Sequence, residues 1–183
     1  MSINVVRLAD AHRAELHELL LAENWTQLAK ELQQNSLQVF TQYVALARGH
    51  VVGWLEGTAR HETDAEVPGF PTPWAQVNYV LIHPALRRRG IAGDLLRRFA
   101  HDEHSAGRRF MVLWHDRRED SGGRFAFFTA HGFQPIAGTG LVGVDVQQLL
   151  TSPGAARPVS DQRADAPAPC HRPVPSSRST VSP

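Results

Sequence analysis

Residues 74–105 constrain the fold most, because they predict a buried strand, a tight turn and an amphipathic helix in direct succession. The nearly continuous apolar run over residues 77–82 is typical of a strand that is covered on both faces. Pro84 ends this run, and Ile91, Leu95 and Phe99 then recur at helical spacing. The amino terminus of a helix should therefore lie just beyond the end of a central strand.

The turn between this strand and helix has the features of a phosphate-binding site. It contains, in order, Arg87, Arg88, Arg89, Gly90, Ile91, Ala92 and Gly93. Glycine and other small residues let the backbone approach a ligand closely, and the N–H groups at a helix amino terminus lie at the positive end of the helix dipole. The arginines can add charge-assisted hydrogen bonds, or they can simply form a solvent-exposed face.

Two motifs in this chain resemble those of the GNAT superfamily of acyl-CoA-dependent N-acyltransferases. Residues 87–92 fit its Q/R-x-x-G-x-G/A signature, and the preceding Ile-His-Pro at 82–84 fits its V-x-P strand ending. Residues 121–133, SGGRFAFFTAHGF, resemble the family's short helix that ends in a Gly-Phe pair. The motifs occur in the family's order, and the resemblance covers roughly residues 3–150.

The resemblance implies a GNAT-like fold of the α+β or α/β class, in which a mixed, mostly antiparallel central sheet is flanked by helices on both faces. The hydrophobic pattern predicts further strands at 3–8, 39–47, 51–56, 109–114 and 141–146, and helices at 10–22 and 24–33. Residues 57–73 show neither the helical nor the strand period in their apolar residues, which predicts a long loop. Its acidic side chains either attract a cationic amine or are merely solvated.

The composition changes abruptly at Thr151. The segment 151–183 holds seven of the chain's twelve prolines and no aromatic residue. It cannot bury enough apolar surface to offset its conformational entropy. We therefore predict an acyltransferase domain at 1–150 and a disordered tail rich in Pro, Ser, Ala and Arg at 151–183.

Composition also bears on the setting of the protein. Cys170 is the single cysteine, which excludes an intramolecular disulfide framework and favours a cytoplasmic protein. No segment approaches the roughly 20 apolar residues that span a bilayer, so we expect no membrane partner. The net charge of +1 is uninformative. Nucleic-acid binding by the arginines and the tail is a rival that we do not favour, and the oligomeric state, including a homodimer, stays open.

The resemblance implies acetyl-CoA or another acyl-CoA as co-substrate, a primary amine on a small molecule, peptide or protein as acceptor, and no metal. The pantetheine arm should follow the strand before the turn, with a backbone N–H near Leu81 or Ile82 facing the thioester carbonyl. Such an oxyanion donor is worth about 3 kcal/mol. The expected coenzyme-binding residues are Leu81, Ile82, Arg87, Arg88, Arg89, Gly90, Ile91, Ala92, Gly93 and Phe128.

Two departures from the family pattern leave the general acid and base unassigned. Phe128 stands where many relatives have a tyrosine that protonates the coenzyme thiolate, and Gln76 stands where some have a basic glutamate. The candidate catalytic residues are Glu56, as a base acting through water, Tyr79 and His131. Tyr79 should alternate away from Gln76, toward either the cleft or the core. His131 shares the helical side of Phe128, or is only a surface histidine.

The favoured function is therefore transfer of an acetyl or other short acyl group to a primary amine by direct attack, without a covalent enzyme intermediate. A positioned acid or base is worth about 10²- to 10⁴-fold in rate. Loss of both groups makes a catalytically weak or inactive acyl-CoA-binding regulatory module the alternative.

Overall fold

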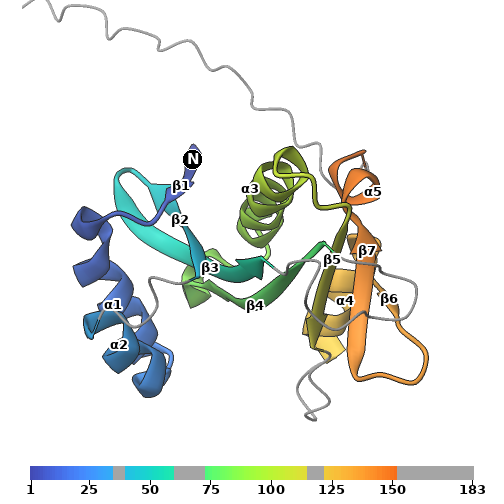
Figure 1. Cartoon of the computed structure of the whole chain (residues 1–183). Helices are drawn as coiled ribbons and strands as arrows, with labels where there is room; N and C mark the ends of the chain where they lie inside the picture. The colour runs from blue at the N-terminus through green and yellow to red at the C-terminus, as the bar shows by residue number, and fades with distance from the viewer. Residues whose placement is uncertain (35–39, 60–72, 115–121, 152–183) are drawn as a thin grey trace, which may run out of the picture.

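The computed structural model of the chain describes residues 1–34, 40–59, 73–114 and 122–151, which form one seven-stranded sheet with helices on both faces (Figure 1). The predicted tail at 151–183, apart from Thr151, and most of the predicted loop at 57–73 lie outside these residues. The strands are β1 (Ile3–Arg7), β2 (Thr41–Ala47), β3 (His50–Ala59), β4 (Trp74–Ile82), β5 (Phe110–Trp114), β6 (Gln134–Pro135) and β7 (Leu141–Asp145). The α-helices are α1 (Arg13–Ala22), α2 (Thr26–Gln33), α3 (Ile91–Ser105), α4 (Gly122–Ala130) and α5 (Val146–Thr151).

The strand order is β1-β2-β3-β4-β5-β7-β6, and all neighbouring strands are antiparallel except β4 and β5. The parallel β4–β5 pair is joined by the α3 crossover, as parallel strands require. The predicted fold class, a mixed and mostly antiparallel sheet with helices on both faces, is confirmed.

Each face of the sheet has its own core. On one face, α3, which carries the fully buried Phe99, and α5 pack against inward side chains of β2 to β5 and β7, among them Leu55 and Met111. On the other face, α1 and α2 cover Val44, Trp54 and other side chains of β2 to β4. Strand alternation explains the division, since neighbouring residues of β3 point to opposite faces.

A β-bulge interrupts β4 at Asn78. Glu56 of β3 is opposite Tyr79, and the next residue, Gly57, is opposite Val77, so Asn78 is the extra residue of β4. Bulges bend a strand and increase its twist. The β4–β5 ladder runs from Trp74 to Val77 and ends immediately before the bulge, and the two strands diverge beyond it (Figure 1).

The strand predicted at 51–56 ends earlier than β3 does, and α5 was not predicted. Strand β3 continues to Ala59, through a glycine that sequence reasoning assigned to the following loop. Gly57 stays in the strand because α3 lies against it: an added Cβ would be 2.3 Å from Cζ of Phe99. Helix α5 has only six residues, too few for a helical period to show in the sequence.

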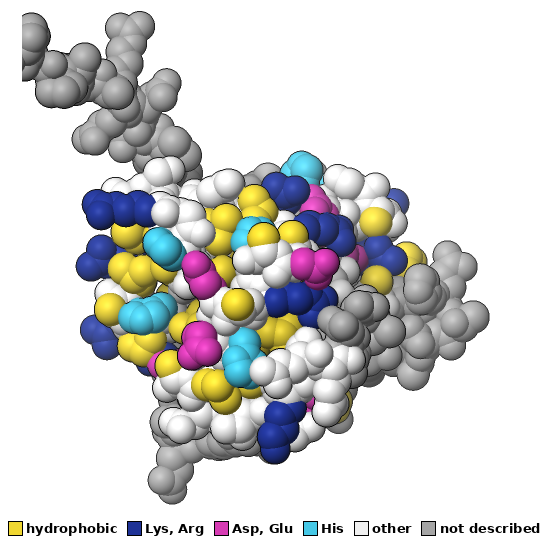
Figure 2. Space-filling view, turned by 90° about the vertical axis from the view of Figure 1, so that its left-hand side faces the viewer, with side chains coloured by type: hydrophobic (Ala, Val, Ile, Leu, Met, Phe, Trp, Pro, Cys, Tyr) yellow, Lys and Arg dark blue, Asp and Glu magenta, His cyan; other side chains and the backbone are white. Residues whose placement is uncertain are grey.

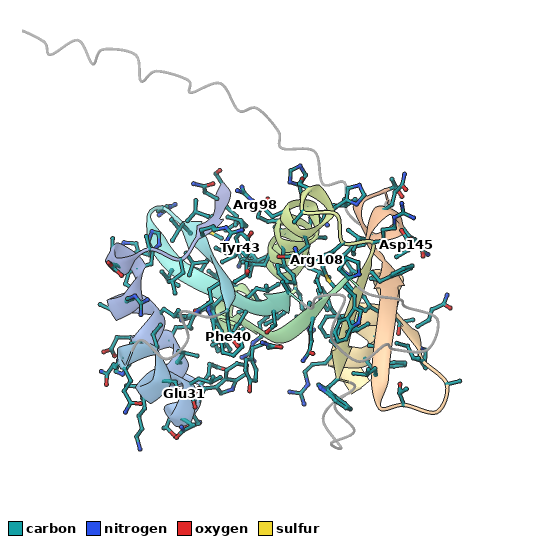
Figure 3. The ribbon with its side chains drawn as sticks, in the orientation of Figure 1. Glu31, Phe40, Tyr43, Arg98, Arg108 and Asp145 are labelled. Atoms are coloured by element: carbon teal, nitrogen blue, oxygen red, sulfur yellow. The ribbon has the colours of Figure 1, made fainter. Side chains whose placement is uncertain are left out.

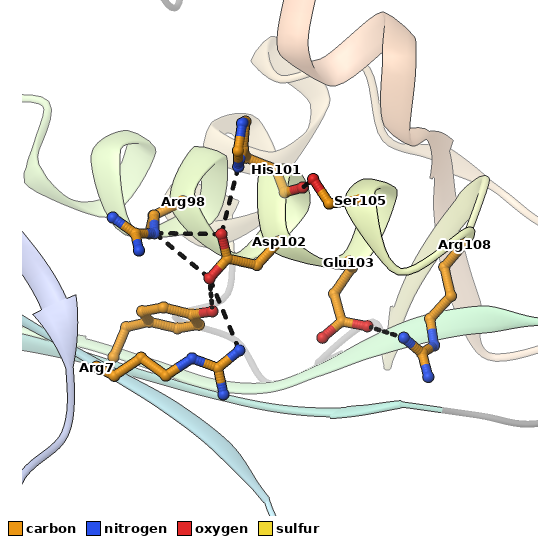
Figure 4. Close-up of polar contacts among 8 residues, drawn as sticks. Arg7, Arg98, His101, Asp102, Glu103, Ser105 and Arg108 are labelled. Atoms are coloured by element: carbon orange, nitrogen blue, oxygen red, sulfur yellow. Dashed lines mark hydrogen bonds and ion pairs between the residues drawn. The ribbon is translucent and has the colours of Figure 1, made fainter.

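Helix α3 is also fastened to β1 and β2 by a polar cluster centred on Asp102 (Figure 4). The Asp102 carboxylate accepts a hydrogen bond from the Tyr43 hydroxyl and lies near the guanidinium groups of Arg7 and Arg98. Burial raises the pKa of Asp102, but the hydrogen bonds from Tyr43, His101 and Arg98 outweigh it and hold the pKa below its ordinary value. This ionised cluster holds the edge of the sheet to α3.

No helix within the described ranges has both the length and the apolar character that are needed to cross a bilayer.

The close approach of α3 to β3 predicts that Gly57→Ala destabilises the protein. The new methyl group must displace the buried Phe99 ring, which should lower the free energy of unfolding by about 2 kcal/mol. The melting temperature should fall by about 5 °C. Gly123→Ala is the control, since its Cβ would meet nothing within 4 Å, and it should be neutral or slightly stabilising. Equal melting temperatures for Gly57→Ala and wild type would contradict the packing.

Candidate active site

Backbone groups of β4 face the opening between β4 and β5. The N–H of His83 donates to the carbonyl oxygen of Val52 on β3, 2.9 Å away. This bond determines which residues at the end of β4 direct their backbone groups toward β3. By alternation, Leu81 also directs its N–H and C=O toward β3, whereas Val80 and Ile82 direct theirs toward β5. These two residues lie beyond the last β4–β5 pair. Among the described residues no strand pairs with this part of β4, so its edge, called the open edge below, offers the N–H groups of Val80 and Ile82 rather than that of Leu81.

The turn after β4 leads directly into α3, whose first N–H groups have no acceptor within the helix. Arg88 and Gly90 both have left-handed backbone conformations, with φ of 61° and 85°. The first helical hydrogen bond runs from the N–H of Asp94 to the carbonyl oxygen of Gly90, at 3.1 Å. The N–H groups of Ile91, Ala92 and Gly93 thus precede the helical ladder and lie at the positive end of the α3 dipole. This geometry suits an anionic group such as a pyrophosphate.

The three arginines of the turn have different surroundings. Arg87 forms an ion pair with Glu23 at the end of α1, and its Nε donates to the carbonyl oxygen of Ile82 at 3.1 Å. Arg88 and Arg89 are exposed. Arg87 therefore ties the turn to α1, while its two neighbours lie in solvent just before the N–H groups that begin α3.

Glu56 is a buried carboxylate on the α1–α2 side of β3, with 1% of its surface exposed. The Asn78 side chain bridges two strands: its Nδ2 lies 3.2 Å from Oε1 of Glu56 and 2.8 Å from Oγ1 of Thr58. Oε2 of Glu56 has no hydrogen-bond partner within the described part of the chain. Burial, opposed by the Asn78 hydrogen bond and reinforced by the charge of Glu31, raises the pKa of Glu56 to about 7. A carboxylate with this pKa suits proton transfer near neutral pH.

Tyr79 lies on the same face as Glu56, because the bulge places two successive residues, Asn78 and Tyr79, on one side of β4. The expected alternation of Tyr79 away from Gln76 and Asn78 is therefore wrong, since it assumed a regular strand. Tyr79 is not in the core: 41% of it is exposed. Its ring stacks on Trp54 with centroids 6.0 Å apart and meets Trp25 edge-on at 5.6 Å.

His131 lies elsewhere, between α4 and the start of α3. Its Nδ1 is 2.8 Å from the carbonyl oxygen of Phe127 and so donates a hydrogen, which leaves Nε2 as the acceptor in the neutral ring. Nε2 faces Gly93, where an added Cβ would be 3.0 Å away. Phe128 packs edge-on against Phe127 and Phe133. The structure thus brings Glu56 and Tyr79 together and places His131 beside the turn.

Sequence reasoning missed four residues of this region: Trp25, Glu31, Asn78 and Val80. The polar pair Gln76 and Asn78 in an otherwise apolar strand was a usable signal, and Nε2 of Gln76 donates to Oδ1 of Asn78 at 3.1 Å. Trp25 and Glu31 line a pocket that depends on how α2 packs, which no local pattern encodes. Among the residues described, no group of three or more His, Cys, Asp or Glu side chains could hold a metal ion.

Comparison with known proteins identifies the family. The model of the acetyltransferase (GNAT) domain matches residues 38–135, more than half of the chain. The chain therefore belongs to the GNAT acetyltransferase family. A search of curated proteins found no match.

Solved structures similar to this chain include several acetyltransferases. Aminoglycoside acetyltransferase AAC(6')-Iy, in complex with a bisubstrate analogue of coenzyme A and acetylneamine, is 18% identical with a TM-score of 0.63, over 76% of this chain and 95% of its own. The PaiA N-acetyltransferase of Thermoplasma acidophilum, with coenzyme A, is 16% identical with a TM-score of 0.59, over 79% and 99%. A GNAT acetyltransferase of Brucella melitensis, with acetyl-CoA, is 20% identical with a TM-score of 0.53, over 79% and 88%. At these identities the likeness establishes the fold.

The raised pKa of Glu56 predicts a pH-dependent stability. The folded state holds this proton more tightly than the unfolded state, so the free energy of unfolding falls as pH rises from 4.5 to about 7. Glu56→Gln removes the buried charge. It should raise stability above pH 7 by on the order of 2–3 kcal/mol, with the gain vanishing near pH 4.

Urea unfolding of Glu56→Gln at several pH values measures this difference. Glu18→Gln is the control, because the Glu18 side chain is 80% exposed and should change stability little at any pH. A difference between Glu56→Gln and wild type that does not vary with pH would contradict the assignment.

Proposed function

We propose that the protein transfers an acetyl or other short acyl group from acyl-CoA to a primary amine by direct attack. The observation that carries this proposal is the buried Glu56 of β3, with a pKa of about 7, which lies beside Asn78 and Tyr79 of β4. Beyond Val77, the other edge of β4 pairs with no strand among the described residues. Membership of the GNAT acetyltransferase family supports the transferase class. We take residues 1–150 as the catalytic domain.

The open edge of β4 and the turn suit the two ends of coenzyme A. The N–H groups of Val80 and Ile82 can pair with the amide groups of the pantetheine arm, as a neighbouring strand would. The N–H groups at the start of α3 can receive the pyrophosphate, with Arg88 and Arg89 nearby. Similar folds solved with coenzyme A or acetyl-CoA support acyl-CoA as co-substrate.

Glu56 supplies the proton acceptor that the reaction requires. An amine attacks only as its neutral form, so the proton of the bound ammonium must leave, and Glu56 can accept it through a water molecule. The amine nitrogen then bonds to the thioester carbon, and the carbon–sulfur bond breaks with its electron pair on the thiolate. The proton that the nitrogen loses on becoming an amide passes to the thiolate through water. A backbone N–H of the open edge can stabilise the negative oxygen of the tetrahedral intermediate. Asn78 holds the Glu56 carboxylate through Oε1.

Phe128 favours a second candidate function. Its ring is packed between Phe127 and Phe133 and carries no proton for a departing thiolate. An acyl-CoA-binding module with little or no turnover would follow if no other group supplies this proton. A thiolate leaves without an acid more readily than an alkoxide, so catalysis remains our first choice.

Acetyl transfer to a panel of primary amines tests the proposal. We expect thiol release with a kcat/KM that rises with pH and levels off above about 7, as Glu56 loses its proton. Glu56→Gln should lower kcat about 10²-fold or more and remove this limb of the profile, whereas Glu18→Gln should match wild type.

The same experiment separates the alternatives. A rise in melting temperature with acetyl-CoA but no thiol release on any amine would favour the binding module. An unchanged melting temperature at millimolar acetyl-CoA would contradict both functions.

A further inference from the structure

An open pocket of about 300 Å³ lies between α2 and β4, on the face that carries Glu56. Asn24, which adopts a left-handed conformation with φ of 62°, turns the chain from α1 into α2 and forms one wall. Other lining residues are Trp25, Gln27, Leu28, Glu31 and Tyr79. The volume is at the lower limit for sites that bind small molecules.

Two aromatic rings form one side of this pocket. Tyr79 is one of the few large apolar side chains exposed within the described residues, yet its ring is fixed between Trp54 and Trp25. Exposed aromatic rings that are held in place attract cations through their negative faces, and tryptophan does so most strongly. The rings therefore favour a positively charged ligand over an anionic one.

A carboxylate completes the pocket. Glu31 lies on the side of α2 that faces β3 and β4 (Figure 3), and the Gln27 side chain donates to its Oε1 at 2.8 Å. The negative charge of Glu31 repels that of Glu56, because the two carboxylates interact electrostatically. A cation between them relieves the repulsion of two like charges.

The wider surface does not select for charge. Figure 2 shows the side of the molecule that carries α1 and α2, where apolar, acidic, basic and histidine side chains are interspersed. A long-range field of one sign is therefore absent from this face as described, and selection must come from the side chains of the pocket itself.

We propose that the acceptor is a small amine with a second positive charge, which Glu31 and the rings of Trp25 and Tyr79 hold while the reacting amine lies near Glu56. This inference rests on the proposed function and deepens it by naming the class of acceptor. A monoamine lacks the group that the pocket binds, and an amino acid presents a carboxylate that Glu31 repels.

Matched acceptors of equal length test the proposal: 1,4-diaminobutane, butylamine and 4-aminobutanoate, each with acetyl-CoA. We expect kcat/KM to be at least about tenfold higher for the diamine than for butylamine, and lowest for 4-aminobutanoate. Glu31→Gln should raise KM for the diamine about tenfold and KM for butylamine much less, and any change in kcat through Glu56, whose pKa depends on Glu31, should be common to both amines. Tyr79→Leu should also raise KM for the diamine, whereas Tyr79→Phe should have the KM of the wild type.

The control variant is Glu18→Gln, which removes an acidic charge from the exposed side of α1. Equal kcat/KM for diamine and monoamine, or an equal loss on both in Glu31→Gln, would overturn the proposal while leaving amine acetylation intact. Calorimetry with 1,4-diaminobutane and coenzyme A measures binding of the diamine without acyl transfer. Binding that weakens in Glu31→Gln would support the pocket even if no amine is acetylated, and absence of binding to wild type would overturn it.

Discussion

The bulge at Asn78 is the constraint on which the rest of the site depends. One extra residue in β4 shifts the register against β3 between Glu56 and Gly57. Just before it, the ladder between β4 and β5 ends, so the two parallel strands separate and the backbone of Val80 and Ile82 becomes an open edge. The same extra residue places Asn78 and Tyr79 on one face, next to Glu56. A single irregularity thus shapes both the edge of β4 that we propose for the coenzyme and the face that we propose for the acceptor.

In this arrangement, the edge of β4 toward β5 and the face of β4 toward α1 and α2 offer different chemical groups. The edge toward β5 and the turn into α3 offer backbone donors, whose strength does not depend on side-chain identity. The face toward α1 and α2, which we propose for the acceptor, carries Tyr79 next to Glu56 of β3. The pocket around Trp25 and Glu31 also includes Tyr79. Burying Glu56 lowers stability at neutral pH, since its proton is bound more tightly when folded. Such a cost is typical of groups that are kept for chemistry rather than for folding.

The fold and the turn before α3 could be predicted from the sequence because they depend on local patterns. The strand, turn and helix of residues 74–105 follow from apolar periodicity, one proline and one glycine, and α3 begins at Ile91, directly after that glycine. The acceptor side could not be predicted in the same way. A bulge changes which face a residue occupies, whereas regular alternation puts Tyr79 on the face opposite to that of Gln76. The pocket depends on contacts between Trp25 and Tyr79, which are 54 residues apart in the sequence. His131 was grouped with the catalytic candidates from its helical spacing, but it lies against Gly93 on the other side of the sheet from Glu56.

Amide hydrogen exchange along β4 tests most directly whether its open edge receives the coenzyme. In the protein alone, the amides of Val80 and Ile82 should exchange faster than that of Leu81, which pairs with β3. Saturating acetyl-CoA should slow exchange at Val80 and Ile82 at least about tenfold and change Leu81 little. Exchange at Val80 and Ile82 that is already as slow as at Leu81, or that stays unchanged on saturation, would contradict the coenzyme edge.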